Sequence, residues 1–118
     1  MQKLHFILLF SIVTYLISCT SSPSTYPTNM QKAENYMNTR PDSALILLQG
    51  LADSIDVYPE ETQMYWHLLA IQAKDKQYIV HTSDSLINSI VEFYEGCSDK
   101  EKLMLTYYYQ GRVYRDMN

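Results

Sequence analysis

The residues of this 118-residue chain with side chains suited to chemistry are two cysteines, an adjacent pair of glutamates and isolated histidines. None of them has the spacing of a known catalytic or ligand-binding motif: G-x-S-x-G, H-E-x-x-H, P-loop and C-x-x-C patterns are absent from the sequence. His67 is adjacent to Trp66 and His81 is isolated, which favours solvated or hydrogen-bonded histidines over metal ligands. The sequence therefore predicts a protein without catalysis, metal or cofactor.

The N-terminal segment has the features of an export signal. Lys3 supplies a short positive region, and an apolar stretch follows from Leu4 to Ile17. A membrane-spanning helix needs about 20 apolar residues, so this shorter stretch fits the apolar part of a signal peptide. It ends in Leu16-Ile17-Ser18-Cys19, which resembles the lipobox of bacterial lipoproteins. The alternative is an uncleaved N-terminal anchor with an incidental cysteine.

This resemblance implies that a peptidase cuts between Ser18 and Cys19 and that the Cys19 sulfur carries a diacylglyceryl group. We then expect a signal peptide over residues 1–18, a Ser/Thr/Pro-rich tether over 19–28 and a helical region over 29–118. The lipid would hold the chain on a membrane of the bacterial cell envelope. Because no acidic run follows Cys19, the periplasmic side of the outer membrane is favoured. Cys97 would have no cysteine partner, and would be a reactive thiol or a small buried residue.

Composition narrows the choice of partners. With 9 basic and 13 acidic side chains the formal net charge is −4, and the basic residues form no stripe. Nucleic acid is therefore not an expected partner. The chain has only 3 glycines and 4 prolines, which favours long regular elements over a loop-rich fold.

From Asn29 onward, apolar residues recur with helical periodicity, which predicts an all-α fold of antiparallel helix pairs. We expect five helices. The first would begin at a capping box of Thr28 and Gln31, and the fifth at a capping box of Ser98 and Glu101. Between them, helices would run from Pro41 to Gly50, from Pro59 onward with Glu60 and Glu61 in the first turn, and from about Ser83–Asp84 to Gly96. The apolar faces comprise Met30, Ala33, Tyr36 and Met37; Ala44, Leu47, Leu48 and Leu51; Trp66, Leu69, Ala70 and Ala73; Leu86, Ile87, Ile90, Val91 and Tyr94; and Leu103, Tyr107, Gly111 and Tyr114.

Two of these helices carry a similar motif. Trp66-x-x-Leu69-Ala70-x-x-Ala73 and Tyr107-x-x-Gln110-Gly111-x-x-Tyr114 resemble the first-helix signature of tetratricopeptide repeats, W-x-x-L-G-x-x-Y. Their separation in the sequence is longer than the family's usual repeat of about 34 residues. With the lipobox and the segment Pro41-Asp42-Ser43-Ala44-Leu45, the chain resembles lipoproteins of the Bacteroidota that carry tetratricopeptide-like arrays. This resemblance implies a tetratricopeptide-like α-solenoid that acts as a curved, non-catalytic scaffold for a protein or peptide partner.

The same resemblance places a candidate partner-binding groove. Its residues are His67, Lys74, Tyr108, Arg112 and Arg115, with Met64, Ile71 and Leu105 beside them. Arg112 and Arg115 are three residues apart and so are neighbours on the helix surface. Their guanidinium groups either bind a carboxylate of the partner or remain solvated near the end of the helix. Because Asn118 falls where the first helix of a repeat turns into the second, we expect the chain to be the N-terminal part of a longer array.

Two other functions stay open from sequence. One is a glycan-capturing outer-membrane lipoprotein, for which Tyr36, Tyr65, Tyr94, Tyr108 and Tyr109 would share one exposed patch. The other is the sensory portion of a truncated regulator.

Overall fold

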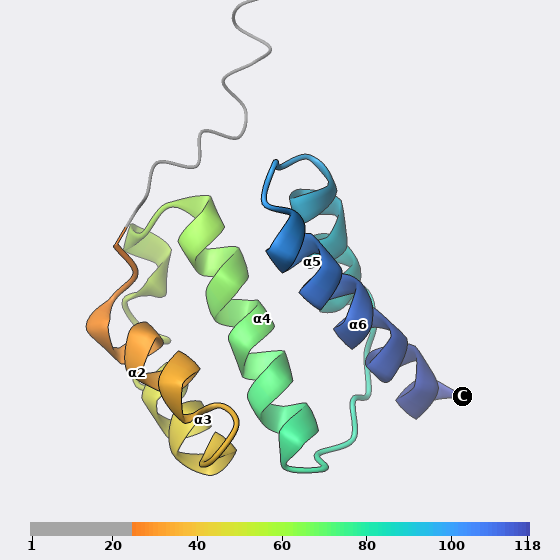
Figure 1. Cartoon of the computed structure of the whole chain (residues 1–118), viewed down its shortest axis with the longest axis horizontal. Coiled ribbons are helices and arrows are strands. Elements are labelled where there is room, and N and C mark those ends of the chain that lie inside the picture. The colour runs from red at the N-terminus through yellow and green to blue at the C-terminus, as the bar shows by residue number, and fades with distance from the viewer. Residues whose placement is uncertain (1–24) are drawn as a thin grey trace, which may run out of the picture.

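The protein is all-helical in the part that its structure, a computed structural model, describes: residues 25–118 (Figure 1). The elements are α2 (Thr28–Tyr36), α3 (Pro41–Gln49), the 3-10 helix η1 (Ile55–Val57), α4 (Glu60–Lys76), α5 (Ser85–Glu95) and α6 (Lys100–Met117), and no strand occurs among them. Adjacent helices pack in pairs, which confirms the predicted all-α class. No helix in the described range is long and apolar enough to cross a membrane. The predicted signal peptide, with Ser18 and Cys19, lies outside the described residues.

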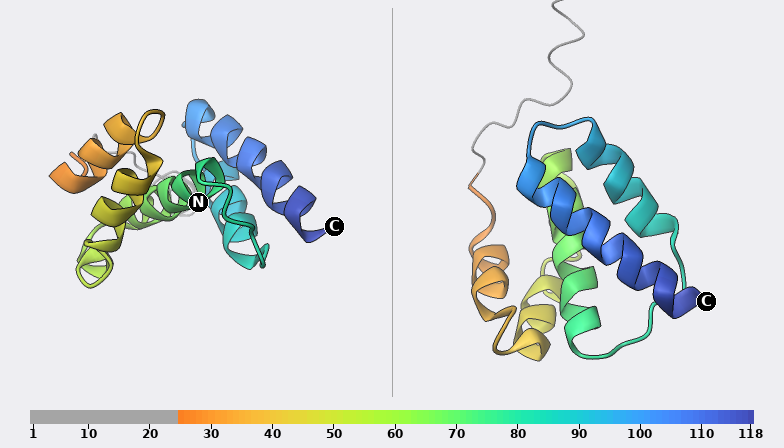
Figure 2. Two further views of the ribbon diagram at one scale, coloured as in Figure 1. Left: turned by 90° about the horizontal axis from the view of Figure 1, so that it is seen from below. Right: turned by 45° about the vertical axis from the view of Figure 1, so that its right-hand side comes forward.

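Helix α4 is the centre of the molecule. The α2–α3 pair lies on one side of it and the α5–α6 pair on the other (Figure 2). Each pair contributes an apolar cluster that α4 completes. Leu69 and Ala73 face the first cluster, while Leu68 and Ile71 face the second. Burying two neighbouring leucines in opposite directions lets one helix join both halves of the fold.

The helices begin largely where the sequence predicts, with two exceptions. Pro41 opens α3, and Pro59 precedes α4, whose first turn holds two glutamates. The capping box at Thr28 is wrong: the residue before α2 is Pro27, and the Gln31 amide donates instead to the carbonyl oxygen of Tyr26. The cap of α6 is also displaced by one residue. Asp99, not Ser98, accepts the hydrogen bond from the backbone N–H of Lys102.

The predicted apolar face of α6 is correct at Leu103, which packs against the second cluster, but wrong at Tyr107 and Tyr114. The buried face is Thr106, Tyr109 and Val113, whereas Tyr107 and Tyr114 are each at least 40% exposed. Their hydroxyls donate to Glu95 and Asn88 of α5, so these rings lie across the edge of the α5–α6 pair. A Cβ built on Gly111 would meet nothing within 4 Å, so no helix approaches this glycine closely.

Helix α4 does not pack closely on the helix that follows it. Helices α4 and α5 contact each other less than α5 contacts α6 or α3 contacts α4. Residues 77–84 separate them as a linker without helix. Both signature segments instead bond to the helix before them. Trp66 Nε1 donates to the Leu48 carbonyl in α3, much as Tyr107 Oη donates to Glu95 in α5.

Candidate functional site

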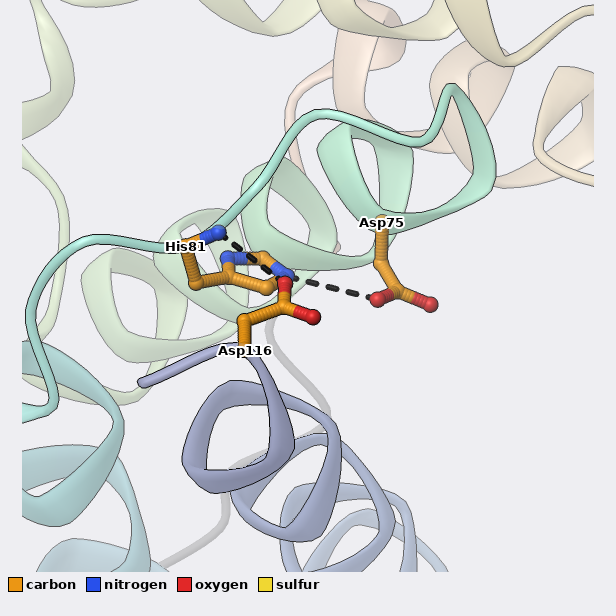
Figure 3. A group of neighbouring side chains, drawn as sticks. All are labelled: Asp75, His81 and Asp116. Atoms are coloured by element: carbon orange, nitrogen blue, oxygen red, sulfur yellow. Dashed lines mark hydrogen bonds and ion pairs between the residues drawn. The ribbon is translucent and has the colours of Figure 1, made fainter. Parts of the chain in front are cut away.

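Polar side chains gather where α4 ends, where the linker turns and where α6 ends. Asp75 comes from the last turns of α4, His81 from the linker and Asp116 from the end of α6 (Figure 3). His81 Nε2 lies 3.4 Å from Asp75 Oδ1, and the His81 backbone N–H donates to Asp116 Oδ2 at 3.0 Å. The side chains of Asp75 and His81 are each only 8% exposed. These contacts hold the segment from residue 75 to residue 81 at both of its ends.

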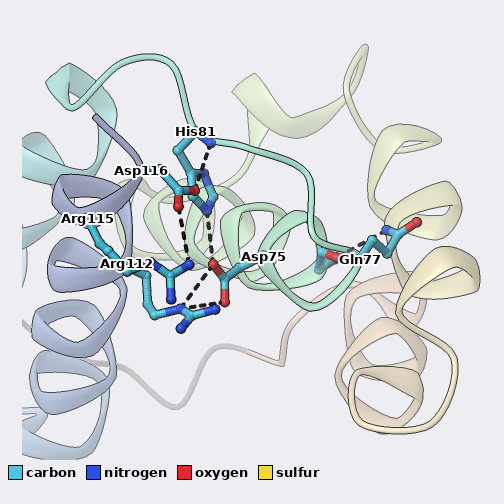
Figure 4. A network of polar contacts seen from close by, with 7 residues as sticks. Asp75, Gln77, His81, Arg112, Arg115 and Asp116 are labelled. Carbon is cyan, nitrogen blue, oxygen red and sulfur yellow. Dashed lines mark hydrogen bonds and ion pairs between the residues drawn. The ribbon is translucent and has the colours of Figure 1, made fainter. Parts of the chain in front are cut away.

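Two arginines balance the charge of the carboxylates (Figure 4). Arg112 Nε donates to both oxygens of Asp75, at 3.1 and 3.2 Å, and Arg115 Nη2 donates to Asp116 Oδ1 at 3.2 Å. The hydrogen bond to Asp75 raises the pKa of Arg112. The hydrogen bond from the His81 backbone, followed by the contact with Arg115, lowers the pKa of Asp116. We call these five residues (Asp75, His81, Arg112, Arg115 and Asp116) the clasp.

The clasp contains the side-chain types of a metal site. One ligand atom from each of Asp75, His81 and Asp116 lies within 4.8 Å of the others. Two carboxylates and an imidazole suit zinc. Here, however, each carboxylate already has a guanidinium partner, so the anionic charge that would attract a cation is neutralised. The arrangement is best described as an ion-pair network that fastens the linker to α4 and α6.

Between the two ends of the clasp the chain makes a tight turn. The N–H of Tyr78 bonds to the Asp75 carbonyl, and that of Ile79 bonds to the Lys74 carbonyl, each at 3.0 Å. These are the two bonds of a Schellman motif, whose turning residue adopts a left-handed conformation and is usually glycine. Tyr78 occupies that position with φ 60°. Its side chain is 90% exposed, and Ile79 and Val80 are 44% and 64% exposed. We call Tyr78, Ile79 and Val80 the tip.

A shallow hollow of about 340 Å³ lies beside the tip. Its apolar lining includes Ile71, Ile87 and Val113, and Lys74 also borders it. Lys74 and Lys76 are both exposed, and no ion pair joins either to another residue of the described range. This end of the molecule thus combines exposed apolar side chains with two unneutralised positive charges.

A second polar cluster lies at the opposite end of α4. The Tyr26 hydroxyl donates to Glu61 Oε1 at 2.7 Å, and its ring stacks on Tyr65 with 4.9 Å between centroids. The Lys102 ammonium lies over both rings, at 5.5 and 4.7 Å, and Tyr94 also donates to Glu61. Burial, followed by the hydrogen bond to Glu61, raises the pKa of Tyr26. The last residues of the predicted tether are therefore part of the packed unit.

The candidate groove residues lie on two helices, His67 and Lys74 on α4 and the other three on α6. Arg112 and Arg115 belong to the clasp, so Arg112 does meet a carboxylate, but one of its own chain. Lys74 borders the hollow, and Tyr108 is exposed beside Tyr109. His67 lies against Trp66, where burial lowers its pKa. Of the flanking positions, Ile71 is buried in the second cluster, against which Met64 and Leu105 pack.

Two further expectations, the tyrosine patch and an unpartnered Cys97, are not met. The proposed tyrosine patch does not form, because Tyr65, Tyr94 and Tyr109 are at most 5% exposed whereas Tyr36 and Tyr108 reach the surface. Cys97 is half-buried against the second cluster. The described residues include no free cysteine, so the expectation that Cys97 lacks a partner is not met.

Sequence reasoning missed Asp75, Asp116 and the tip. The sequence gives only a weak indication of this site. Three consecutive residues with large apolar side chains or rings, Tyr78, Ile79 and Val80, follow two lysines and precede His81. Neither left-handed backbone at a tyrosine nor contact between α4 and α6 can be read from periodicity. Comparison with known proteins adds no identification, since no family model, curated protein or solved structure matches this chain.

Proposed function

We propose that this chain is a membrane-anchored lipoprotein whose helices form a tetratricopeptide-like, non-catalytic scaffold for a protein or peptide partner. The lipid would be attached to the sulfur of Cys19, a peptidase would then cut between Ser18 and Cys19, and the lipid would hold the protein on the cell envelope. The support for the anchor is the order of elements in the sequence: a positive start, a short apolar stretch, Ser18-Cys19 and a Ser/Pro-rich segment.

The observation that carries the scaffold proposal is the packing of α2 with α3 and of α5 with α6, with α4 in contact with both pairs. Moreover, α4 contacts α6 and α2 as well as its neighbours in sequence. Contacts between successive helices and between every second helix are what a stacked array of helix pairs requires.

The anchor is tested by mass spectrometry of the chain expressed in a bacterium that matures lipoproteins. We expect the mature chain to begin at Cys19 and to carry the added mass of the lipid. The Cys19→Ala variant should lack that mass and remain uncut. An unmodified Cys19 in the wild-type chain would overturn the anchor.

The scaffold is tested by photo-crosslinking in cells. A photoreactive amino acid at Tyr108, a candidate groove position, should capture a defined protein. The same amino acid at Ile46, which is similarly exposed on α3, is the matched control. Equal capture from both positions would count against a specific partner at the candidate groove.

A further inference from the structure

We propose that the tip, together with Lys74 and Lys76, is a docking surface for a membrane that contains anionic phospholipid. The starting point is that folding does not account for the tip. The turning position of a Schellman motif favours glycine, and Tyr78 holds it with φ 60° while its ring is 90% exposed. A tyrosine that neither suits its backbone nor packs against the protein points to an interaction outside the chain.

The chemistry of the surface fits a lipid interface. Tyrosine places its apolar ring and its hydroxyl at the boundary between acyl chains and headgroups, and Ile79 and Val80 add exposed aliphatic area. Lys74 and Lys76 stand beside them, and each lysine near an anionic membrane surface contributes about 1 kcal/mol. The hollow next to Lys74 has a mixed lining, in which Ile71, Ile87 and Val113 add apolar surface beside the tip.

The clasp keeps this surface in place. Its contacts hold the chain before the tip through Asp75 and after it through His81. Gln77 adds a third point of attachment, because its amide donates to the carbonyl oxygens of Pro41 and Ala73. The tip is therefore presented by a fixed loop and not by a free one, which lowers the entropy lost on docking.

The length of the N-terminal segment allows the tip to reach the membrane. The chain from Cys19 to Thr25 has a reach of roughly 20 Å when extended. Helix α4, with 17 residues, is about 25 Å long, and Tyr26 is bound near its start whereas the tip follows its end. A body lying along the surface would place the lipid and the tip on the same membrane. This step relies on the proposed anchor at Cys19.

The test places a fluorophore at the tip of the full-length chain reconstituted in vesicles. The Tyr78→Trp variant is compared with Ile46→Trp, a matched exposed position on α3, after subtraction of the Trp66 signal. The vesicles contain equal parts of phosphatidylglycerol and phosphatidylcholine with brominated acyl chains. We expect quenching for Tyr78→Trp only. Adding Lys74→Gln and Lys76→Gln should lower the ratio of docked to undocked protein about thirtyfold. Val80→Trp gives a second reporter if the first variant folds poorly.

The outcomes are distinct. Tyr78→Trp emission that is unquenched, or quenched equally with Ile46→Trp, would overturn the docking surface. So would protection of the tip from an aqueous quencher only when a second protein is present, since the occupant would then be a protein. The mass of the reconstituted chain is measured on the same sample. Failure of the anchor is thus seen as an unmodified Cys19, and failure of docking as an unquenched tip on a lipidated chain.

Discussion

At Tyr78 the backbone and the side chain both depart from what a stable fold favours. Left-handed backbone costs an ordinary L-residue about 1–2 kcal/mol, and glycine avoids most of that cost. The exposed ring recovers none of it through packing. The residue therefore reduces stability in the isolated protein, which is the pattern expected of a position kept for binding.

Substitutions at Tyr78 should show that its backbone conformation lowers the stability of the fold. Tyr78→Gly should raise the free energy of unfolding by about 0.5–1 kcal/mol, because relief of the left-handed strain exceeds the added entropy of the unfolded chain. Urea unfolding measures this change. Tyr78→Ala is the control, since it removes the ring but keeps the strain. Equal stability of the Gly and Ala variants would show that the backbone at this position is not strained.

The clasp should make stability depend on pH. The backbone N–H of His81 and the guanidinium of Arg115 keep the pKa of Asp116 below its usual range in the folded state. A depressed folded pKa adds stability above the unfolded value of about 3.9, and this contribution is lost as the pH falls through the folded pKa. The stability difference between wild type and Asp116→Asn should accordingly be present near pH 6 and shrink below about pH 4.

Urea unfolding at a series of pH values measures this difference. Glu92→Gln is the matched control, because it removes one exposed negative charge from α5 without touching the clasp. If Asp116→Asn and Glu92→Gln show the same pH dependence, the ion pair at Asp116 contributes nothing specific.

At the scale of the elements, the start of α6 tests which residue caps the helix. Asp99 Oδ1 accepts the backbone N–H of Lys102 at 3.1 Å, and Oδ2 pairs with the Lys102 ammonium at 2.9 Å. Asp99→Ala should cost about 1 kcal/mol, the usual value of an N-cap. Ser98→Ala should change stability by less than about 0.5 kcal/mol, as an exposed position does. Thermal unfolding distinguishes the two, and a larger loss for Ser98→Ala would restore the capping box that the sequence predicts.

The helices themselves were predictable because their signals are local. Each signal depends only on residues within one or two helical turns. Examples are Pro41, the glutamates after Pro59 and the periodicity of Ile87, Ile90 and Tyr94. The face of α6 was not predictable, because Tyr107 and Tyr114 satisfy an aromatic pattern while their hydroxyls require polar partners. The face that is buried, at Thr106, Tyr109 and Val113, carries similar residue types, and its tyrosine and valine pack with residues of α4 and α5.

The candidate site was the least predictable part for the same reason. His81, Arg112 and Arg115 were noted from sequence, but the clasp needs Asp75 beside Arg112, a contact across 37 residues. Such a contact depends on α4 and α6 lying side by side at their C-terminal ends. Between α4 and α6 lie the linker and all of α5, so the two helices can pack in several registers, and the sequence of either one alone does not choose among them.

For the whole molecule, α4 is the structural link between two halves that otherwise have separate apolar clusters. Leu68 and Leu69 are both at most 1% exposed and adjacent in sequence, yet they face different clusters. Replacing either with alanine should cost about 2–4 kcal/mol because it leaves a cavity. Leu68→Ala should loosen the α5–α6 pair, and Leu69→Ala the α2–α3 pair.

Amide hydrogen exchange resolved by helix measures where each substitution acts. If α4 joins two partly independent halves, Leu68→Ala should speed exchange in α5 and α6 while α2 and α3 stay close to wild type, and Leu69→Ala should give the reverse. Uniform acceleration from α2 to α6 by both variants would instead mean that the protein opens only as a single unit. If the two halves respond separately, the α5–α6 half can open on its own, and this half supplies Arg112 and Asp116 to the clasp. Leu68→Ala should then release the tip, while the hydrogen bond between Tyr26 and Glu61 persists.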